Sequence, residues 1–386
     1  MREFDVLVVG GGPAGSTCAR ALARRGLRVG VLDRARFPRD KVCAGWITPA
    51  VVEELGLDLA EYAAERVLQP IRGFRVALEG GPAAEARHRE VVSYAIRRCE
   101  FDEALLRGAG AELLLGEGLR DLAREGGRIR VNGRFAARVV VGAGGHFCPV
   151  ARWLGARPGE GEPAVVAREV EFPMEPEQEA ACPVDPELPE LFFARDLRGY
   201  GWVVRKGRWL NVGIGRQDAH RFPERVDAFL DFLERCGRVP PGLPRRLRGH
   251  AYLLYEQAPR PLGASGVLLV GDAAGLAYNR SGEGIRPAVE SGLLAARVIA
   301  EAGGRVDDAA VDRYRELLTA RFGERRGHPR PGPTDWLPAA WRAPVVGWLL
   351  GRAWFARPVV VDRWFLHRHV PPLPADGVSA EAPAAA

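Results

Sequence analysis

The chain has 386 residues, enough for two or three domains, and its 47% hydrophobic and 27% charged residues are typical of a globular protein. Its formal net charge is +6, but almost all of the basic residues are arginine, since Lys41 and Lys206 are the only lysines. The arginines are spread along the chain and interleaved with acids, which argues against nucleic-acid binding.

The chain opens with the signature of a dinucleotide-binding unit. An apolar strand predicted over residues 4–9 leads into Gly10, Gly12 and Gly15, and a helix over 16–25 and a strand over 28–32 follow. Gly10 allows a tight turn, Gly12 lets a pyrophosphate approach the backbone, and Gly15 lets helix and strand pack closely. The free N–H groups and the dipole of the helix start face the phosphates. Asp33, at the end of the second strand, is placed to accept hydrogen bonds from a ribose.

Residues 34–46 form a predicted loop in which basic residues flank Cys43. A helix follows over 49–55. The alternating runs 71–78 and 90–96 predict a β-hairpin that turns at 80–82. The next helix is predicted over 98–106, with Arg98 near its start.

Short strands near Leu113 and Ile129 precede a strand over 137–141 that enters a second glycine turn, residues 142–145. This turn is either a tight connection below the sheet or a second contact with the nucleotide. Because neither a clear helix nor an acid follows it, we expect no dedicated fold for a second dinucleotide.

Residues 158–189 are rich in Pro and Glu and show little periodicity. Strands are then predicted over 191–195, 199–207 and 208–215, the last two forming an antiparallel hairpin. A helix over 223–236 has an apolar face made of Val226, Phe229, Leu230 and Leu233. We interpret this block as a substrate domain inserted into the nucleotide domain.

The chain then returns to a buried strand over 266–270, which ends in Gly271 and Asp272. A glycine-rich turn with Gly282, Gly284 and Ile285 begins an Ala-rich helix. The Asp272 carboxylate can accept hydrogen bonds from ribityl or ribose hydroxyls, while the glycines and the helix start admit an anionic or electron-rich ligand edge.

Tryptophan is concentrated near the C-terminus, at 336, 341, 348, 354 and 364. A spanning helix here would bury Arg352 and Arg357 at about 2.5–3.5 kcal/mol each, and Pro358 would break it. Two interpretations stay open: an aromatic and arginine-rich helix at a membrane interface, or a cover on the substrate domain. The Pro/Ala-rich tail, residues 371–386, is predicted to be disordered.

The six cysteines are far apart and form no CxxC pair, so we expect no metal site and no cysteine-ligated cluster. The first residues already belong to the predicted nucleotide-binding strand, and no signal peptide precedes them. With free thiols, this predicts a cytoplasmic protein, with peripheral membrane attachment open.

The Gly10–Gly15 turn with Asp33, the Arg98-x-x-Phe-Asp motif and the Gly271-Asp272 motif together resemble the FAD-binding set of the para-hydroxybenzoate hydroxylase type of flavoprotein. Within that superfamily the chain resembles the geranylgeranyl reductase family over about residues 1–320. The resemblance implies FAD as cofactor, bound by Gly10, Gly12, Pro13, Ala14, Gly15, Asp33, Arg34, Cys43, Ala44, Gly45, Arg98, Gly271, Asp272, Gly282, Gly284 and Ile285.

The implied fold is α/β (α+β overall): a Rossmann-like FAD-binding domain with an inserted antiparallel-sheet substrate domain and a helical C-terminal region. The FAD-binding domain is predicted over 1–70, 96–160 and 258–320, the substrate domain over 71–95 and 161–257, and the helical region over 321–370.

The resemblance implies that reduced FAD transfers hydride to a carbon–carbon double bond of a prenyl chain, with Cys43, Tyr200 and Trp202 as the catalytic and channel-lining residues. Cys43 either donates a proton or is a small buried side chain; Tyr200 and Trp202 either line the channel or pack in the sheet. Three departures from the family pattern stand at 204–205 (Val-Arg for Phe-Pro), Asn279 (for Pro) and Gly144 (for Asp).

Alternative activities share the flavin motifs. An FAD monooxygenase acting on an aromatic or polyketide substrate uses the same set, and a flavin halogenase is disfavoured because Tyr200 interrupts the Trp-x-Trp strand of that group. An electron-transfer flavoprotein is a further alternative. The electron donor is expected to be NAD(P)H or a reduced ferredoxin, and the partner a prenyl lipid or other hydrophobic small molecule.

Overall fold

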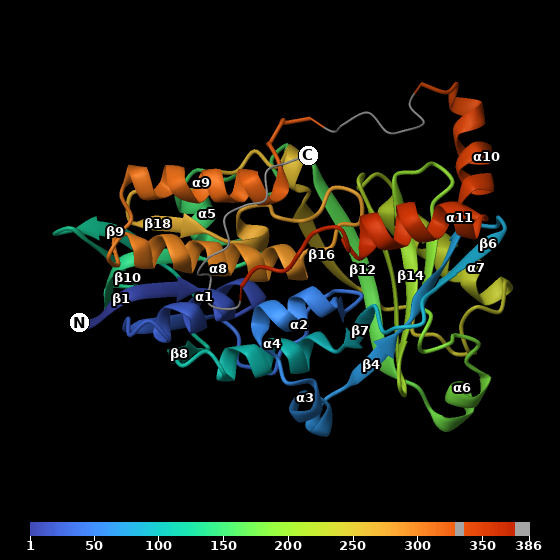
Figure 1. The fold of residues 1–386 in the computed structure, drawn as a ribbon, viewed down its shortest axis with the longest axis horizontal. Helices are drawn as coiled ribbons and strands as arrows, with labels where there is room; N and C mark the ends of the chain where they lie inside the picture. The colour runs from blue at the N-terminus through green and yellow to red at the C-terminus, as the bar shows by residue number, and fades with distance from the viewer. Residues whose placement is uncertain (329–335, 375–386) are drawn as a thin grey trace.

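Two large β-sheets lie side by side along the long axis of the computed structural model, which describes residues 1–328 and 336–374 (Figure 1). The first has five parallel strands at its centre, in the order β18 (Val267–Leu269), β11 (Phe135–Gly142), β1 (Arg2–Val9), β2 (Val29–Asp33) and β8 (Glu112–Leu115). Antiparallel strands extend it: β17 (Gly263–Ala264), β10 (Arg128–Val131) and β9 (Leu122–Glu125).

The parallel strands are apolar because they are buried on both faces. Val6, Leu7, Val8 and Val140 are fully buried. The principal helices of this half are α1 (Pro13–Ala23), α2 (Pro49–Leu55), α3 (Leu59–Glu65), α4 (Arg98–Arg107), α5 (Pro149–Trp153), α8 (Ile285–Glu301) and α9 (Asp308–Phe322). The predicted order of strand, glycine turn, helix and strand is confirmed as β1, residues 10–12, α1 and β2.

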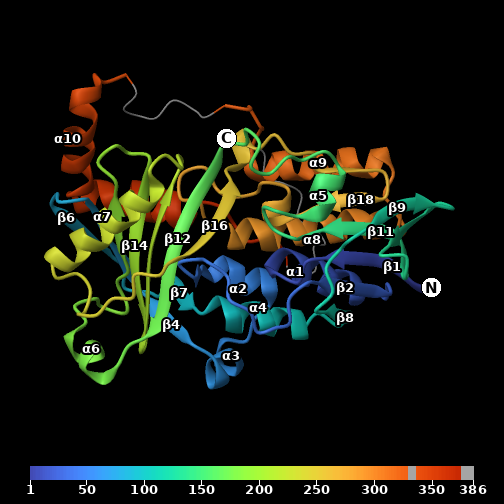
Figure 2. The ribbon, with the colours of Figure 1, turned by 180° about the vertical axis from the view of Figure 1, so that it is seen from behind.

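The second sheet has seven strands, in the order β16 (Arg248–Leu253), β12 (Ala164–Pro173), β15 (Trp209–Arg216), β14 (Gly199–Lys206), β13 (Glu190–Phe193), β5 (Gly73–Leu78) and β6 (Ala83–Arg87). All neighbours pair antiparallel except β13 and β5. Helix α7 (Phe222–Arg235) covers one face, as seen from behind in Figure 2, and its predicted apolar residues are buried there. The opposite face borders the cavity described below and is also covered in part by the C-terminal segment.

Two expectations for this region are wrong. The hairpin partner of β5 is β6, whereas β7 (Ser93–Ile96) joins β3 (Trp46–Ile47) and β4 (Leu68–Ile71) in a separate three-stranded sheet. Strand β6 escaped prediction because its inward side chains are only alanines. In addition, residues 158–189 contain the ten-residue strand β12 and the short helix α6 (Pro176–Ala181). Charged residues within β12 obscured its alternation.

The C-terminal region divides into a covering part and an outward part. The π-helical segment η3 (Ala356–Phe365) packs on the second sheet through Ala356, Val360, Val361 and Phe365, whereas α10 (Ala339–Leu350) and α11 (Ala353–Phe355) precede it at the edge (Figure 1). None of the described helices combines the length and apolarity needed to cross a bilayer.

The segment predicted to be disordered, 371–386, lies outside the described residues from 375 onward. Just before that point, Arg286 donates to the carbonyl oxygen of Pro371 at 3.0 Å, and the amide of Leu373 donates to Glu54 at 3.1 Å. These bonds join the end of the described chain to the start of α8 and to the end of α2.

Candidate functional site

The glycine turn after β1 has the close approaches that its sequence predicts. Gly10 has φ +115°, and a Cβ there would lie 2.3 Å from the Ala143 carbonyl oxygen. A Cβ on Gly15 would lie 1.9 Å from the Gly10 oxygen. Beside Gly12, by contrast, only an Arg39 nitrogen at 3.4 Å comes near. The turn is therefore closed toward the protein and open toward the cavity, as a pyrophosphate cradle requires.

Asp33 ends β2 at the rim of the same cavity. Its carboxylate accepts from the backbone N–H of Gly11 and from that of Ala35, each at 2.8 Å. The side chain thus holds the glycine turn in place and keeps further lone pairs for a ribose hydroxyl.

One cavity of about 740 Å³ joins the motifs that the sequence places far apart. The three glycine-rich turns, the Cys43 loop and the end of β18 all reach it, and so do three strands of the second sheet, β12, β14 and β16. Gly15 is the single predicted site residue that does not line it, because it packs α1 against β1. The predicted residues that do line it are Gly10, Gly12, Pro13, Ala14, Asp33, Arg34, Cys43, Ala44, Gly45, Arg98, Tyr200, Trp202, Gly271, Asp272, Gly282, Gly284 and Ile285.

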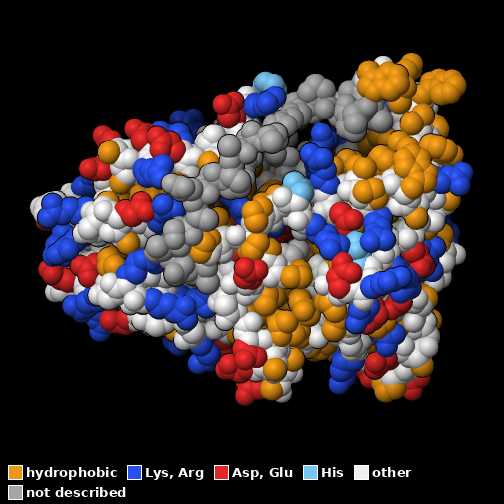
Figure 3. Space-filling model, viewed as in Figure 1, with side chains coloured by type: hydrophobic (Ala, Val, Ile, Leu, Met, Phe, Trp, Pro, Cys, Tyr) orange, Lys and Arg blue, Asp and Glu red, His pale blue; other side chains and the backbone are white. Residues whose placement is uncertain are grey.

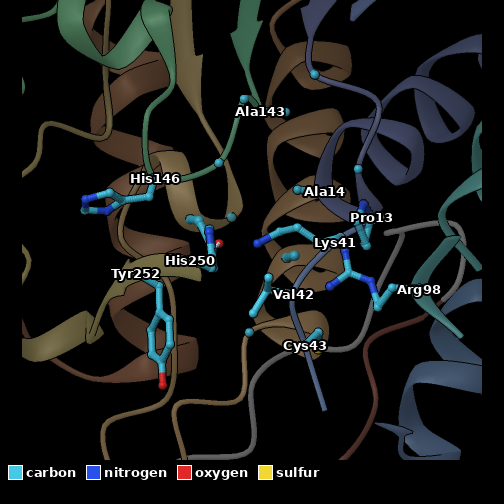
Figure 4. A pocket seen from close by; sticks show the side chains of 18 of the residues that line it. Pro13, Ala14, Lys41, Val42, Cys43, Arg98, Ala143, His146, His250 and Tyr252 are labelled. Atoms are coloured by element: carbon cyan, nitrogen blue, oxygen red, sulfur yellow. Dashed lines mark hydrogen bonds and ion pairs between the residues drawn. The ribbon is translucent and has the colours of Figure 1, made fainter. Parts of the chain in front are cut away.

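Arg98 is buried at the start of α4 and bound to Asp102 one turn later. The two side chains make a bidentate pair, with both N–O distances 2.8 Å. Burial alone would lower the pKa of Arg98, but Asp102 and Cys43 outweigh burial and raise it. Arg98 is therefore a permanent cation that contacts Cys43 in the cavity wall (Figure 4).

Asp272 follows β18 and faces His250, whose Nε2 lies 3.2 Å from the carboxylate. Burial acts to raise the pKa of Asp272, but the hydrogen bond with His250 and the nearby Lys41 outweigh it and lower that pKa. The side chain is therefore an anionic acceptor, which suits it to bind sugar-chain hydroxyls.

The Cys43 loop is held from behind by two strands of the second sheet. The amide of Cys43 donates to Glu169 at 2.7 Å, and Asn211 Nδ2 donates to the Cys43 carbonyl at 3.1 Å. Asn211 is fully buried, and its Oδ1 accepts from Trp202 Nε1 at 2.8 Å. Burial raises the pKa of Glu169 to about 7. The loop and the aromatic strand are thus parts of one hydrogen-bonded unit.

The cavity wall on the side of the second sheet is aromatic. Tyr200 packs on Trp202 with ring centroids 6.0 Å apart and on Phe365 of η3 at 5.2 Å, and its hydroxyl donates to the Ser281 carbonyl. Tyr252 of β16 adds a further ring. This wall offers apolar surface directly beside Cys43.

Several residues of the site were missed by sequence reasoning. Lys41, His146, His250 and Tyr252 line the cavity, and they are labelled in Figure 4. His250 and Tyr252 are two apart on β16, so they share one face of the strand. That spacing was a usable signal, but the strand itself was not predicted. His146 directly follows the second glycine turn, where a contact with the nucleotide was one of two interpretations.

Comparisons with known proteins agree with this geometry. Residues 5–108 match the family described as FAD dependent oxidoreductase. The chain is 31% identical over 341 residues to digeranylgeranylglycerophospholipid reductase 1 of Methanopyrus kandleri, covering 83% of this chain and 87% of the relative. It is 32% identical over 320 residues to menaquinone reductase of Mycobacterium tuberculosis, covering 76% of each.

A solved structure from Thermoplasma acidophilum, described as geranylgeranyl bacteriochlorophyll reductase-like, has the same fold with a TM-score of 0.75. The two sequences are 23% identical, and the alignment covers 91% of this chain and 92% of the Thermoplasma chain. The predicted Rossmann-like α/β fold with a helical C-terminal region is thereby confirmed.

Proposed function

This chain belongs to the family of FAD-dependent oxidoreductases that includes the two reductases above, and from this premise we propose that it reduces carbon–carbon double bonds of a prenyl chain. The observation that carries the proposal is the continuity of one cavity. Its FAD-binding half, with the glycine turns, Asp33 and Asp272, opens directly onto the aromatic half, with Tyr200 and Trp202. The name of the Methanopyrus relative refers to geranylgeranyl chains, and an aromatic wall suits such a hydrocarbon.

Bound FAD, once reduced, supplies the hydride. The chain's own residues then have two tasks. The Cys43 thiol is placed to give a proton to the second alkene carbon, so that hydride and proton together saturate the bond. The Arg98 guanidinium, which contacts Cys43, stabilises the thiolate that remains. Tyr200, Trp202 and Tyr252 keep water away from the reacting carbons.

Electrons come from an external donor, either NAD(P)H or a reduced ferredoxin. To distinguish these donors, the oxidised protein is mixed anaerobically with each donor in turn, and the loss of flavin absorbance is recorded. A donor that reduces the flavin within a turnover time is the physiological class.

Because a prenyl lipid resides in a bilayer, we also propose that this chain binds to a membrane surface. Four tryptophans of the C-terminal region are exposed, Trp336 at 79%, Trp341 and Trp354 at 64%, and Trp348 at 53%. Figure 3 shows hydrophobic side chains gathered over α10 at that edge of the molecule. Arg352 stacks on Trp348, a combination that suits the lipid headgroup region.

The test of the activity is anaerobic. The protein is reduced chemically and mixed with geranylgeranyl lipids; reoxidation of the flavin without oxygen, with a product heavier by two hydrogens per bond, is expected. Flavin that stays reduced until air is admitted, followed by an oxygenated aromatic product, would instead identify a monooxygenase.

The role of Cys43 has a matched control. Cys43→Ala is expected to keep FAD and to lose at least about tenfold in turnover, since general acids contribute about 10²–10⁴-fold. Cys236→Ala, at an exposed position, should leave turnover unchanged. Unchanged turnover in Cys43→Ala would remove the thiol from the mechanism.

A further inference from the structure

The two lysines of this chain lie on either side of one loop. Only Lys41 and Lys206 interrupt the otherwise uniform use of arginine among 55 basic residues. Lys41 begins the segment that contains Cys43, and a Cβ on Gly45 at its other end would lie 2.5 Å from Lys206 Nζ. An ammonium is a compact point charge, whereas a guanidinium is a broad planar fork. Both groups carry one positive charge, so an arginine at either position would keep the charge but would need more room.

Lys206 is explained by the hydrogen bonds behind the loop. It is fully buried, and its Nζ donates to the Ile96 carbonyl at 2.8 Å and to Glu171 at 2.6 Å. Through these bonds Lys206 joins β14 to β7 and to β12. Lys41 has no such explanation.

Lys41 points into the cavity between His250 and Arg98 (Figure 4). Within the described residues its ammonium has no hydrogen-bond or ion-pair partner. The two carboxylates that act on its charge are already engaged, Asp272 with His250 and Asp102 with Arg98. Burial lowers the pKa of Lys41 to about 8, so it remains mainly protonated at neutral pH. A cation without a partner thus faces the space that FAD requires.

The neighbours of Lys41 show which end of the cofactor it faces. Asp33 marks the adenosine end, and the Gly10–Gly15 turn marks the pyrophosphate. Lys41 interacts with the charges of Asp272, Arg98 and Cys43, and Figure 4 shows its side chain directed toward His250, on the side of the cavity where Tyr252 of the aromatic wall lies. Its charge therefore acts on the flavin end.

We infer that Lys41 is a cofactor-binding residue whose ammonium stabilises the flavin in its reduced, anionic form. A protein controls flavin chemistry through charges placed near the ring, and a cation there favours the anion over the neutral ring. The inference rests on the FAD site of the proposed function but not on the prenyl substrate, and each readout below is taken without substrate.

The experiment compares Lys41→Met and Lys41→Arg in the FAD-loaded protein. An anaerobic titration against a reference dye is read at the potential where the parent flavin is half reduced. In Lys41→Met the ratio of reduced to oxidised flavin is expected to fall about tenfold. The pKa at which the anionic reduced flavin takes up a proton and becomes neutral is expected to rise by about one unit. Lys41→Arg, which keeps the charge, should recover most of both.

Arg107→Met is the charge-matched control, because Arg107 is exposed on α4 and pairs with Glu103 outside the cavity. It should behave like the parent. If Lys41→Met loses FAD during purification while Lys41→Arg retains it, the requirement is for charge and the inference stands. The inference is wrong if Lys41→Met matches the parent in FAD affinity, in the fraction of flavin reduced and in the pKa of the reduced flavin. It is also wrong if Lys41→Arg is as impaired as Lys41→Met.

Discussion

Trp202 and Cys43 are joined by a single buried amide, since Asn211 accepts from the Trp202 indole at 2.8 Å and donates to the Cys43 carbonyl at 3.1 Å. The same amide nitrogen also reaches Glu169 at 3.2 Å. The strand that forms the aromatic wall and the loop that carries the thiol therefore keep a constant spacing. A hydride and a proton can be delivered to adjacent carbons only if that spacing is maintained.

Replacing the amide should loosen this arrangement. Asn211→Leu keeps the branched shape of the side chain but leaves the Trp202 N–H and the Cys43 carbonyl without their partner, at about 1–3 kcal/mol for each unsatisfied group. We expect the free energy of unfolding to fall by roughly 2–5 kcal/mol in urea titrations, with FAD retained and turnover reduced. Trp202→Phe, which removes only the indole donor, should cost less. Equal stability of Asn211→Leu and the parent would contradict the network.

Asp33 should contribute to FAD affinity in two ways. Asp33→Ala removes both the ribose acceptor and the hydrogen bond to the Gly11 amide. Because hydrogen bonds to a charged group are lost, the dissociation constant of FAD should rise at least about tenfold. The flavin content after purification should fall accordingly. Glu3→Ala, an exposed acid on β1, carries the same charge change and should bind FAD normally. Full flavin occupancy in Asp33→Ala would remove Asp33 from the cofactor site.

Stability should depend on pH through Glu54. Burial and the adjacent Glu290 raise the pKa of Glu54 from 4.5 to about 9. Between these pKa values Glu54 holds a proton in the folded protein that it has lost in the unfolded chain. The contribution of Glu54 to the free energy of unfolding therefore falls as the pH rises, by at most about 1.4 kcal/mol per pH unit. Glu54→Gln mimics the protonated side chain, so unfolding free energy measured from pH 5 to 9 should decline less steeply. Identical slopes would show that Glu54 is ionised when folded.

The exposed tryptophans should mediate binding to lipid. The parent should sediment with vesicles of phosphatidylcholine and phosphatidylglycerol, with a blue shift of tryptophan fluorescence. Trp341→Ser, Trp348→Ser and Trp354→Ser combined should weaken the binding more than about tenfold, since each indole can bury 150–250 Å² at about 25 cal/mol per Å².

Trp153→Ser is the control for that experiment, because Trp153 is a 38% exposed tryptophan at the other end of the molecule. It should sediment like the parent. If the parent does not sediment but forms dimers that the triple variant does not, then α10 pairs with a second copy rather than with lipid.

Local pattern predicted a set of cofactor-binding residues that, apart from Gly15, the structure gathers around one cavity. The glycine turn, Asp33, Arg98 and Gly271-Asp272 each have a role that follows from backbone geometry within one strand–turn–helix unit. The hairpin of β14 and β15 and the apolar face of α7 were also predicted, because both follow from short-range alternation and helical periodicity.

The second half of the site could not be predicted in this way. Glu169 and Glu171 on β12 looked like members of a charged, irregular stretch. In the structure Glu169 is buried and Glu171 half-buried, because the Cys43 loop and the strands β14 and β15 bring Lys206 and Asn211 to bind them. A buried carboxylate depends on partners that are distant in sequence. His250 and Tyr252 were missed for the same reason.

The sequence by itself therefore determined that this chain binds FAD in a Rossmann-like unit. That function depends on one short, continuous stretch of backbone, in which the glycines and the residues at the strand ends can be read directly from the sequence. Only the tertiary structure decided which other groups line the predicted FAD cavity: a thiol contacting a permanent cation, an aromatic wall, and an ammonium that has no hydrogen-bond or ion-pair partner among the described residues. These groups meet because the second sheet, built from two separate parts of the chain, lies beside the first.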